Sequence, residues 1–399
     1  MTNLFKNQNS KSPKSKVWGS PIGFRSSKTL LISAFALTGW LSLSPAASAR
    51  LARLYSVEGE QIFLKRSGWS NFYTTAPPTM LYGDDLLRVP PGTTVTLLCP
   101  DRRQTSNVRA GVSSVNEACV GTPRRVRPSF GISDTWAAQD PSIPYVITPW
   151  AGQVLTPTPV LRWHPVPGAR QYRVTLQRHT FDGWEPAWSV LTDQPVLAYP
   201  VNKPPLVVGE EYALQVTAGL GAVASSEEWS PPVVFSVMGG QEAQDAAADI
   251  ATVEAMDVPP GIKTLILAQE VYPTYKLFAQ GMNDLLRLTD TGEASALAYR
   301  LLGDYALRSG LALVAEDSYT QAITLAADAD QLEEMVEARW GLGVVYDRTG
   351  RVDQAREVLA LAQQGAMALG DEDLLGRIEA TMGSSNPAAV PLDNVKIAP

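Results

Sequence analysis

The chain has 399 residues, of which 40 are acidic and 33 are Lys or Arg, giving a formal net charge of −7. Apolar residues make up 45% and charged residues 18%, so the chain can form packed cores and is not disordered throughout. It holds only two histidines and two cysteines, which excludes a zinc site built from several histidines and a four-cysteine cluster.

The amino end has the three parts of a secretory signal peptide. Its first 28 residues carry six Lys or Arg and no acid, an apolar stretch runs from Leu30 to Leu43, and Ala47-Ser48-Ala49 supplies small residues. Fourteen residues rise only ~21 Å as a helix, less than the ~30 Å of a hydrocarbon core. We therefore predict a signal peptide over 1–49, cleaved after Ala49, and Sec-type export; the alternative is an uncleaved anchor. No later stretch is apolar enough to span a bilayer, so we expect a periplasmic or extracellular mature chain.

Charge is unevenly distributed along the mature chain. Without the signal peptide it holds 27 basic and 40 acidic residues, and residues 241–399 alone hold 11 basic and 25 acidic residues. This split predicts two halves of different construction and argues against nucleic acid as a partner of the acidic half.

Residues 50–140 have the pattern of short β-strands. Val57–Lys65 and Thr93–Cys99 are strand-like, and Gly83-Asp84-Asp85 and Pro90-Pro91-Gly92 mark turns. The pattern resembles FecR-like periplasmic domains over about fifty residues. The resemblance implies a β domain of an envelope sensing protein. We find no equivalent of the family's cytoplasmic segment, so its signalling activity is not expected.

Cys99 and Cys119 are the only cysteines. In an exported chain an even number of cysteines predicts a disulfide, and closing a loop of about 20 residues should contribute ~3 kcal/mol. The alternative, a redox-active pair, does not fit the wide spacing.

Arginines cluster in and after that loop. They predict an anion-binding patch for phosphate, a lipid headgroup or an acidic glycan. The alternative is a solvated surface, or pairing with the acidic half of the same chain. The residues are Arg102, Arg103, Arg109, Arg124, Arg125 and Arg127.

Residues 141–240 form a second predicted β region, with strands over 159–163, 171–177, 206–216 and 233–237. A W-x-x-x-P-G-A-x-x-Y signature joins the first two strands, and a corner tyrosine, Tyr212, lies in the third. The segment resembles a fibronectin type III or immunoglobulin-like β-sandwich.

Three tryptophans, Trp184, Trp188 and Trp229, lie outside the predicted strands. Exposed tryptophan can stack on sugar rings, which makes an envelope glycan a possible ligand of the β modules. The alternative is that these residues pack in the core or at sheet edges.

Residues 241–292 predict a helical lead-in, with helices over 241–256, 263–271 and 274–288 and a break at Pro273. The last two of these helices resemble a degenerate repeat.

A repeat with an offset of 40 residues follows over 293–382. Small residues at matched positions would let two helices approach closely, and a glycine ends the first helix of each pair. The pattern resembles tetratricopeptide repeats, whose period is 34 residues; we assign the extra six residues to a longer linker over 328–333. A capping helix over 371–382 and a disordered tail over 383–399 complete the chain. The matched pairs are Leu302/Leu342, Gly303/Gly343, Ala306/Tyr346, Gly310/Gly350, Ala315/Ala355, Tyr319/Leu359 and Ala322/Ala362.

Stacked helical hairpins present the first helix of each pair on a concave face. Two aligned rows on that face predict a groove for a protein or peptide partner, and the acidic surplus favours a partner with a basic segment. Trp340 could instead pack against a neighbouring helix. The rows are Arg300, Asp304 and Leu307 in one repeat and Trp340, Val344 and Asp347 in the next.

Catalytic motifs are absent: there is no G-x-S-x-G, H-E-x-x-H or Walker A sequence. The only imidazoles, His164 and His179, lie in or beside predicted strands. We therefore predict no catalytic residue, cofactor or metal site, although paired carboxylates remain an alternative. A FecR-like module followed by helical repeats is similar to exported proteins of diderm bacteria, among them cyanobacteria. The first hypothesis is a non-catalytic envelope scaffold, and the alternative is a glycan- or peptidoglycan-binding protein.

Overall fold

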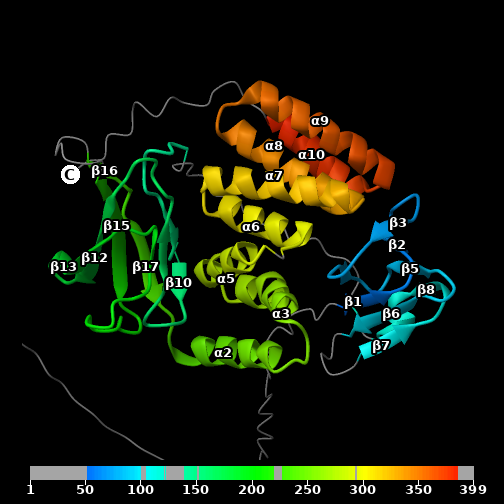
Figure 1. Ribbon diagram of the computed structural model, residues 1–399, viewed down its shortest axis with the longest axis horizontal. Helices are drawn as coiled ribbons and strands as arrows, with labels where there is room; N and C mark the ends of the chain where they lie inside the picture. Colours follow the sequence, from blue (N-terminus) through cyan, green and yellow to red (C-terminus); the bar gives the residue numbers. More distant parts are fainter. Residues whose placement is uncertain are drawn as a thin grey trace, which may run out of the picture. The chain divides into compact units, whose positions relative to one another are not determined.

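The computed structural model describes residues 52–99, 105–120, 122, 139–150, 152–219, 227–292 and 294–384, all within one compact unit. The predicted signal peptide over 1–49, its cleavage point after Ala49 and the predicted tail beyond residue 384 lie outside the described residues. The described part has β-sheets in its amino-terminal half and helices from residue 240 onward, so the predicted order of a β half followed by an α half is confirmed (Figure 1).

The first β region forms two four-stranded antiparallel sheets, with strand orders β4-β1-β6-β7 and β3-β2-β5-β8. Alternate residues of β6 are buried, including Val95 and Leu97, because successive side chains of a strand point to opposite faces. Cys99 and Cys119 form the predicted disulfide. The elements are β1 (Ala52–Glu58), β2 (Ile62–Lys65), β3 (Tyr73–Thr75), β4 (Met80–Leu81), β5 (Leu86–Val89), β6 (Thr94–Leu98), β7 (Thr105–Val108), β8 (Gly111–Ser114) and the short helix α1 (Val115–Ala118).

The second β region has a larger sheet, β10-β17-β15-β12-β13 with β16 on β15, and a three-stranded sheet, β14-β11-β9. Side chains of both sheets share one core, in which Trp163 of the smaller sheet joins Val174 and Leu214 of the larger. The strands are β9 (Val146–Thr148), β10 (Gly152–Val154), β11 (Leu161–Trp163), β12 (Gln171–Thr180), β13 (Gly183–Thr192), β14 (Val196–Leu197), β15 (Glu211–Gly219), β16 (Glu227–Trp229) and β17 (Val233–Val237).

Two predictions for this region are wrong in detail. The strand predicted over 206–216 begins only at Glu211, because Val207 to Glu210 form a turn in which Gly209 has a φ of +80°. Trp184 and Trp188 do not lie outside the strands but in β13, which pairs with β12. The hydroxyl of Tyr212 accepts a hydrogen bond from the Val207 amide at 2.9 Å, as expected of a corner tyrosine.

The helical half contains α2 to α10, with a π-helical turn, η1, between α3 and α4. Each helix from α5 to α9 packs against the next along the chain (Figure 1). None of the helices in the described ranges is both long and apolar enough to cross a membrane. The elements are α2 (Gly240–Glu254), α3 (Pro260–Ile266), η1 (Leu267–Val271), α4 (Tyr272–Thr274), α5 (Phe278–Asp290), α6 (Ala296–Arg308), α7 (Ala312–Asp328), α8 (Leu332–Arg348), α9 (Val352–Leu369) and α10 (Glu372–Ser384).

The helical break predicted at Pro273 lies further along the chain. Helical turns continue through η1 and α4, and the chain leaves them only at Lys276, whose φ is +55°. Proline is tolerated here because it lies in the first turn of α4. The helix predicted to begin at Thr274 therefore begins at Phe278.

Helices α6 to α9 form two consecutive hairpins in which glycines allow close contact. A Cβ added to Gly303 would lie 2.6 Å from the Tyr319 ring, and one added to Gly343 would lie 2.5 Å from the Leu359 side chain. Both pairs come from the 40-residue repeat. The linker predicted over 328–333 is too long, because α7 extends to Asp328 and α8 already begins at Leu332, which leaves only residues 329–331 between the helices.

Candidate binding pocket

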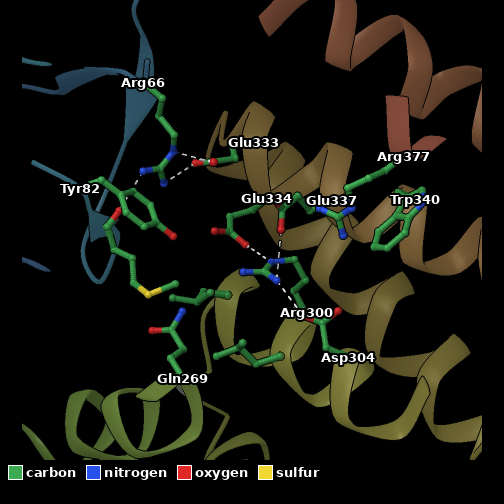
Figure 2. Close-up of a pocket in the computed structure, with 13 residues that line it drawn as sticks. Arg66, Tyr82, Gln269, Arg300, Asp304, Glu333, Glu334, Glu337, Trp340 and Arg377 are labelled. Atoms are coloured by element: carbon green, nitrogen blue, oxygen red, sulfur yellow. Dashed lines mark hydrogen bonds and ion pairs between the residues drawn. The ribbon is translucent and has the colours of Figure 1, made fainter. Parts of the chain in front are cut away.

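A pocket lies where the first β region meets the helical half, and its cavity volume is about 90 Å³ (Figure 2). This volume holds several water molecules or one small group and is below that of a site for a drug-sized molecule. Side chains from the first β region, η1, α6, α8 and α10 form its walls: Arg66, Met80, Tyr82, Gln269, Leu297, Arg300, Leu301, Asp304, Glu333, Glu334, Glu337, Trp340 and Arg377.

Arg300 of α6 is the central cation of the pocket and is only 8% exposed. Its Nε lies 2.6 Å from Glu334, and its Nη1 lies 2.8 Å from Asp304 and 3.4 Å from Glu337. Asp304 also accepts a hydrogen bond from the Tyr319 hydroxyl at 2.8 Å. A buried charge is costly unless it is paired in this way, so these contacts hold the guanidinium in place.

The ionisation of these groups follows from their burial. Burial raises the pKa of Asp304 and of Glu334, although the positive charge of Arg300 opposes the shift. Burial tends to lower the pKa of Arg300, but its three carboxylate neighbours more than offset this and raise it. The cation is therefore firmly charged, while its partners hold their protons more tightly than exposed carboxyls do.

Trp340 of α8 contacts α10 and also lines the pocket. Its indole N–H donates to the Thr381 hydroxyl at 3.0 Å, and the Arg377 guanidinium lies 4.0 Å from the ring centroid. Trp340 therefore packs against a neighbouring helix, which was the alternative, and also lines the pocket.

The first β region supplies one wall through Arg66, which follows β2. Arg66 contacts Glu333 of α8 through Nε at 2.6 Å and Nη2 at 2.7 Å, and its Nη1 donates to Asp85 at 2.8 Å. Tyr82 and Met80 line the pocket beside it. The concave surface expected to be open at this point is therefore closed on one side by the chain's own β region.

The six residues predicted for the groove do not share one surface. Arg300, Asp304 and Trp340 line the pocket, whereas Leu307 and Val344 are buried in the hydrophobic core. This corrects the expectation of two exposed rows, because apolar side chains on α6 and α8 pack against neighbouring helices. Asp347 is half-buried and lies outside the pocket lining.

Only one residue of the predicted anion patch lies within the described residues. Arg109 is described and exposed. The other members, Arg102, Arg103, Arg124, Arg125 and Arg127, lie outside the described residues.

The two histidines lie apart from the pocket lining. His164 is half-buried, and its burial lowers its pKa. His179 is exposed beside Trp184, with ring centroids 4.8 Å apart. Across the described ranges, no group of three or more His, Cys, Asp or Glu is arranged to hold a metal ion.

Sequence reasoning missed most of the pocket's charged groups. Glu333, Glu334 and Glu337 lie in or just after the segment assigned to a linker, although their spacing to Trp340 places several of them on one helical face. Arg66, Tyr82 and Gln269 gave no comparable signal, because they reach the pocket only through contacts between distant parts of the chain.

The sequence was compared with known protein families and with curated proteins. No known family matches it, and no curated protein does either.

Proposed function

We propose that this protein is a non-catalytic scaffold of the cell envelope, exported by a Sec-type signal peptide, that binds a protein partner at the face of α6 and α8. The proposal rests on one observation: the same pocket is lined by Arg300, Asp304, Glu334 and Trp340. A tryptophan beside fixed charges supplies both buried area and orientation to a bound segment.

Charge indicates the kind of partner. The pocket lining holds four carboxylates and three guanidinium groups, and the region from residue 241 onward is strongly acidic. A partner with a basic segment is therefore favoured. The disulfide between Cys99 and Cys119 is compatible with an exported protein.

The finer fold assignments are part of the same proposal. The first β region would be FecR-like, the second would be a fibronectin type III or immunoglobulin-like sandwich, and α6 to α9 would be tetratricopeptide-type repeats capped by α10. The corner position of Tyr212 and the matched contacts of Gly303 and Gly343 support these assignments.

Partner binding can be tested by crosslinking in intact cells with a tagged chain, followed by mass spectrometry. Glu334→Gln removes one pocket charge with little change of shape, and Glu357→Gln makes the same change at an exposed site on α9. We expect crosslinks to a defined envelope protein that fall at least tenfold in Glu334→Gln and persist in Glu357→Gln. Equal crosslinking in both variants would contradict the proposal.

A second candidate, glycan binding, is favoured by the hairpin of β12 and β13. Phe181 at its turn is fully exposed, and Trp184 is 41% exposed, whereas Trp188 is buried. An exposed ring can stack on a sugar. Sedimentation with murein sacculi should then be reduced by Trp184→Ala; if the purified protein does not sediment with sacculi, peptidoglycan binding is rejected.

A further inference from the structure

A buried hydrogen-bond donor in the pocket lacks an acceptor in the described part of the chain. Gln269 Nε2 is buried with no partner among the described residues, while its Oε1 accepts from Arg53 and so fixes the orientation of the amide. Arg300 uses Nε and Nη1 for its carboxylate contacts, and its Nη2 takes part in none of these ion pairs. A buried N–H group without a hydrogen-bond acceptor lowers the stability of the fold, so this part of the pocket is suited to a ligand oxygen.

The carboxylates that hold Arg300 make the adjoining part of the pocket suited to a cation. Oε2 of Glu334 accepts from Arg300 Nε at 2.6 Å, and its Oε1 takes no part in that contact. Asp304, Glu334 and Glu337 all contact the guanidinium of Arg300, and the whole lining holds four carboxylates and three guanidinium groups. The local surplus of negative charge favours an ammonium group.

The buried donor and the carboxylates line the same pocket, so one small molecule can contact both. In Figure 2, Tyr82 and Gln269 lie across the open space from the adjacent side chains of Arg300 and Glu334. Three apolar side chains, Met80, Leu297 and Leu301, complete the lining and offer contact to an apolar substituent.

We infer that this pocket binds an α-ammonium group adjacent to a carbonyl or carboxylate oxygen, as found in a free apolar α-amino acid or at the amino terminus of a peptide. Glu334 accepts from the ammonium group, and Arg300 Nη2 and Gln269 Nε2 donate to the oxygen. This goes beyond the proposed scaffold role, because the free amino acid needs no protein partner.

Titration calorimetry on the full mature chain tests the inference with L-leucine, L-leucyl-glycine and N-acetyl-L-leucine. We expect saturable binding of at least one of the first two, with N-acetyl-L-leucine at least tenfold weaker because it has no ammonium group. Tighter binding of leucine identifies a free amino acid as the ligand, and tighter binding of the dipeptide identifies a peptide terminus. No saturable binding, or equal binding of the acetylated compound, overturns the inference.

Variants connect binding to the named atoms. Gln269→Glu replaces the unmet donor by a carboxylate oxygen, and Glu334→Gln removes the proposed acceptor charge; each should weaken binding at least tenfold. Gln321→Glu and Glu357→Gln make the same changes at exposed helical positions and should leave binding unchanged. If a pocket variant keeps the native circular dichroism spectrum and binds the ligand as tightly as its control variant, the proposed binding site is refuted. Loss of envelope crosslinks alone would count against the scaffold proposal and not against this one.

Discussion

Arg66, just after β2, forms an ion pair with Glu333 in the first turn of α8: Nη2 donates to Oε2 at 2.7 Å, and Nε lies 2.6 Å from Oε1. The two residues are 267 positions apart in the chain. The same guanidinium contacts the fully buried Asp85. One side chain thus links the first β region to the helical half at the edge of the pocket.

Arg66→Ala should strongly destabilise the protein. The change removes the cation that two carboxylates contact, and breaking a buried ion pair costs about 3–5 kcal/mol. Urea unfolding would measure the loss. Arg356→Ala is the control, because Arg356 forms an exposed ion pair with Asp353 on α9 and such pairs contribute at most about 1 kcal/mol. Similar losses in the two variants would contradict a structural role for the contact between the β region and α8.

The pocket carboxyls should affect how stability depends on pH. Burial raises the pKa of Glu334 in the folded state, so folding favours its protonated form. The stability that Glu334 contributes is fully present below its ordinary pKa of 4.5. It is lost as the pH rises through the higher pKa of the folded state. Glu334→Gln should therefore become more stable relative to the wild type as pH rises from about 4 to 7. Urea midpoints at several pH values would show this, and a constant difference would refute it.

The glycines between paired helices should not tolerate a methyl group. In Gly303→Ala the new Cβ would lie 2.6 Å from the buried Tyr319 ring, and overpacking of this kind costs about 1–3 kcal/mol. Gly376→Ala is a matched control, because it lies within α10 with no atom within 4 Å of the new Cβ. That control should gain about 0.5–1 kcal/mol from helix propensity. Thermal unfolding would distinguish the loss of stability expected for Gly303→Ala from the gain expected for Gly376→Ala. A stabilised Gly303→Ala would show that the helices are less closely packed.

Loss of the disulfide should destabilise the first β region. Cys99 and Cys119 are 20 residues apart, and closing a loop of that length contributes about 3 kcal/mol in the chain-entropy model. Replacing both cysteines by serine, or reducing the protein, should lower the urea midpoint accordingly. Thiol titration of the unfolded, unreduced protein should detect no free thiol, and two thiols per chain would contradict the bond.

Local patterns in the sequence were enough to predict the two halves and several of their details. The 40-residue repeat predicted a close approach of paired helices at Gly303 and Gly343, because close helix packing leaves a periodic pattern of small residues. The structure places these two glycines against the Tyr319 ring and the Leu359 side chain. The disulfide followed from the presence of two cysteines in a chain predicted to be exported, and Tyr212 was predicted from its place after a turn. Boundaries were less accurate: helical turns continue through Pro273, and the linker predicted over 328–333 is shortened to 329–331 by the ends of α7 and α8.

The sequence by itself determined the order of a β half and an α half, the repeat and the small residues that let its helices approach. Only the tertiary structure decided the pocket, because Arg66, Gln269 and Arg377 come from parts of the chain whose spacing carries no shared period. Two residues on the same face of α6 also have different surroundings. Arg300 lines the pocket, whereas Leu307, seven positions further along, packs into the hydrophobic core. Helical periodicity fixes which side chains share a face, but which parts of that face are covered depends on contacts distant in sequence.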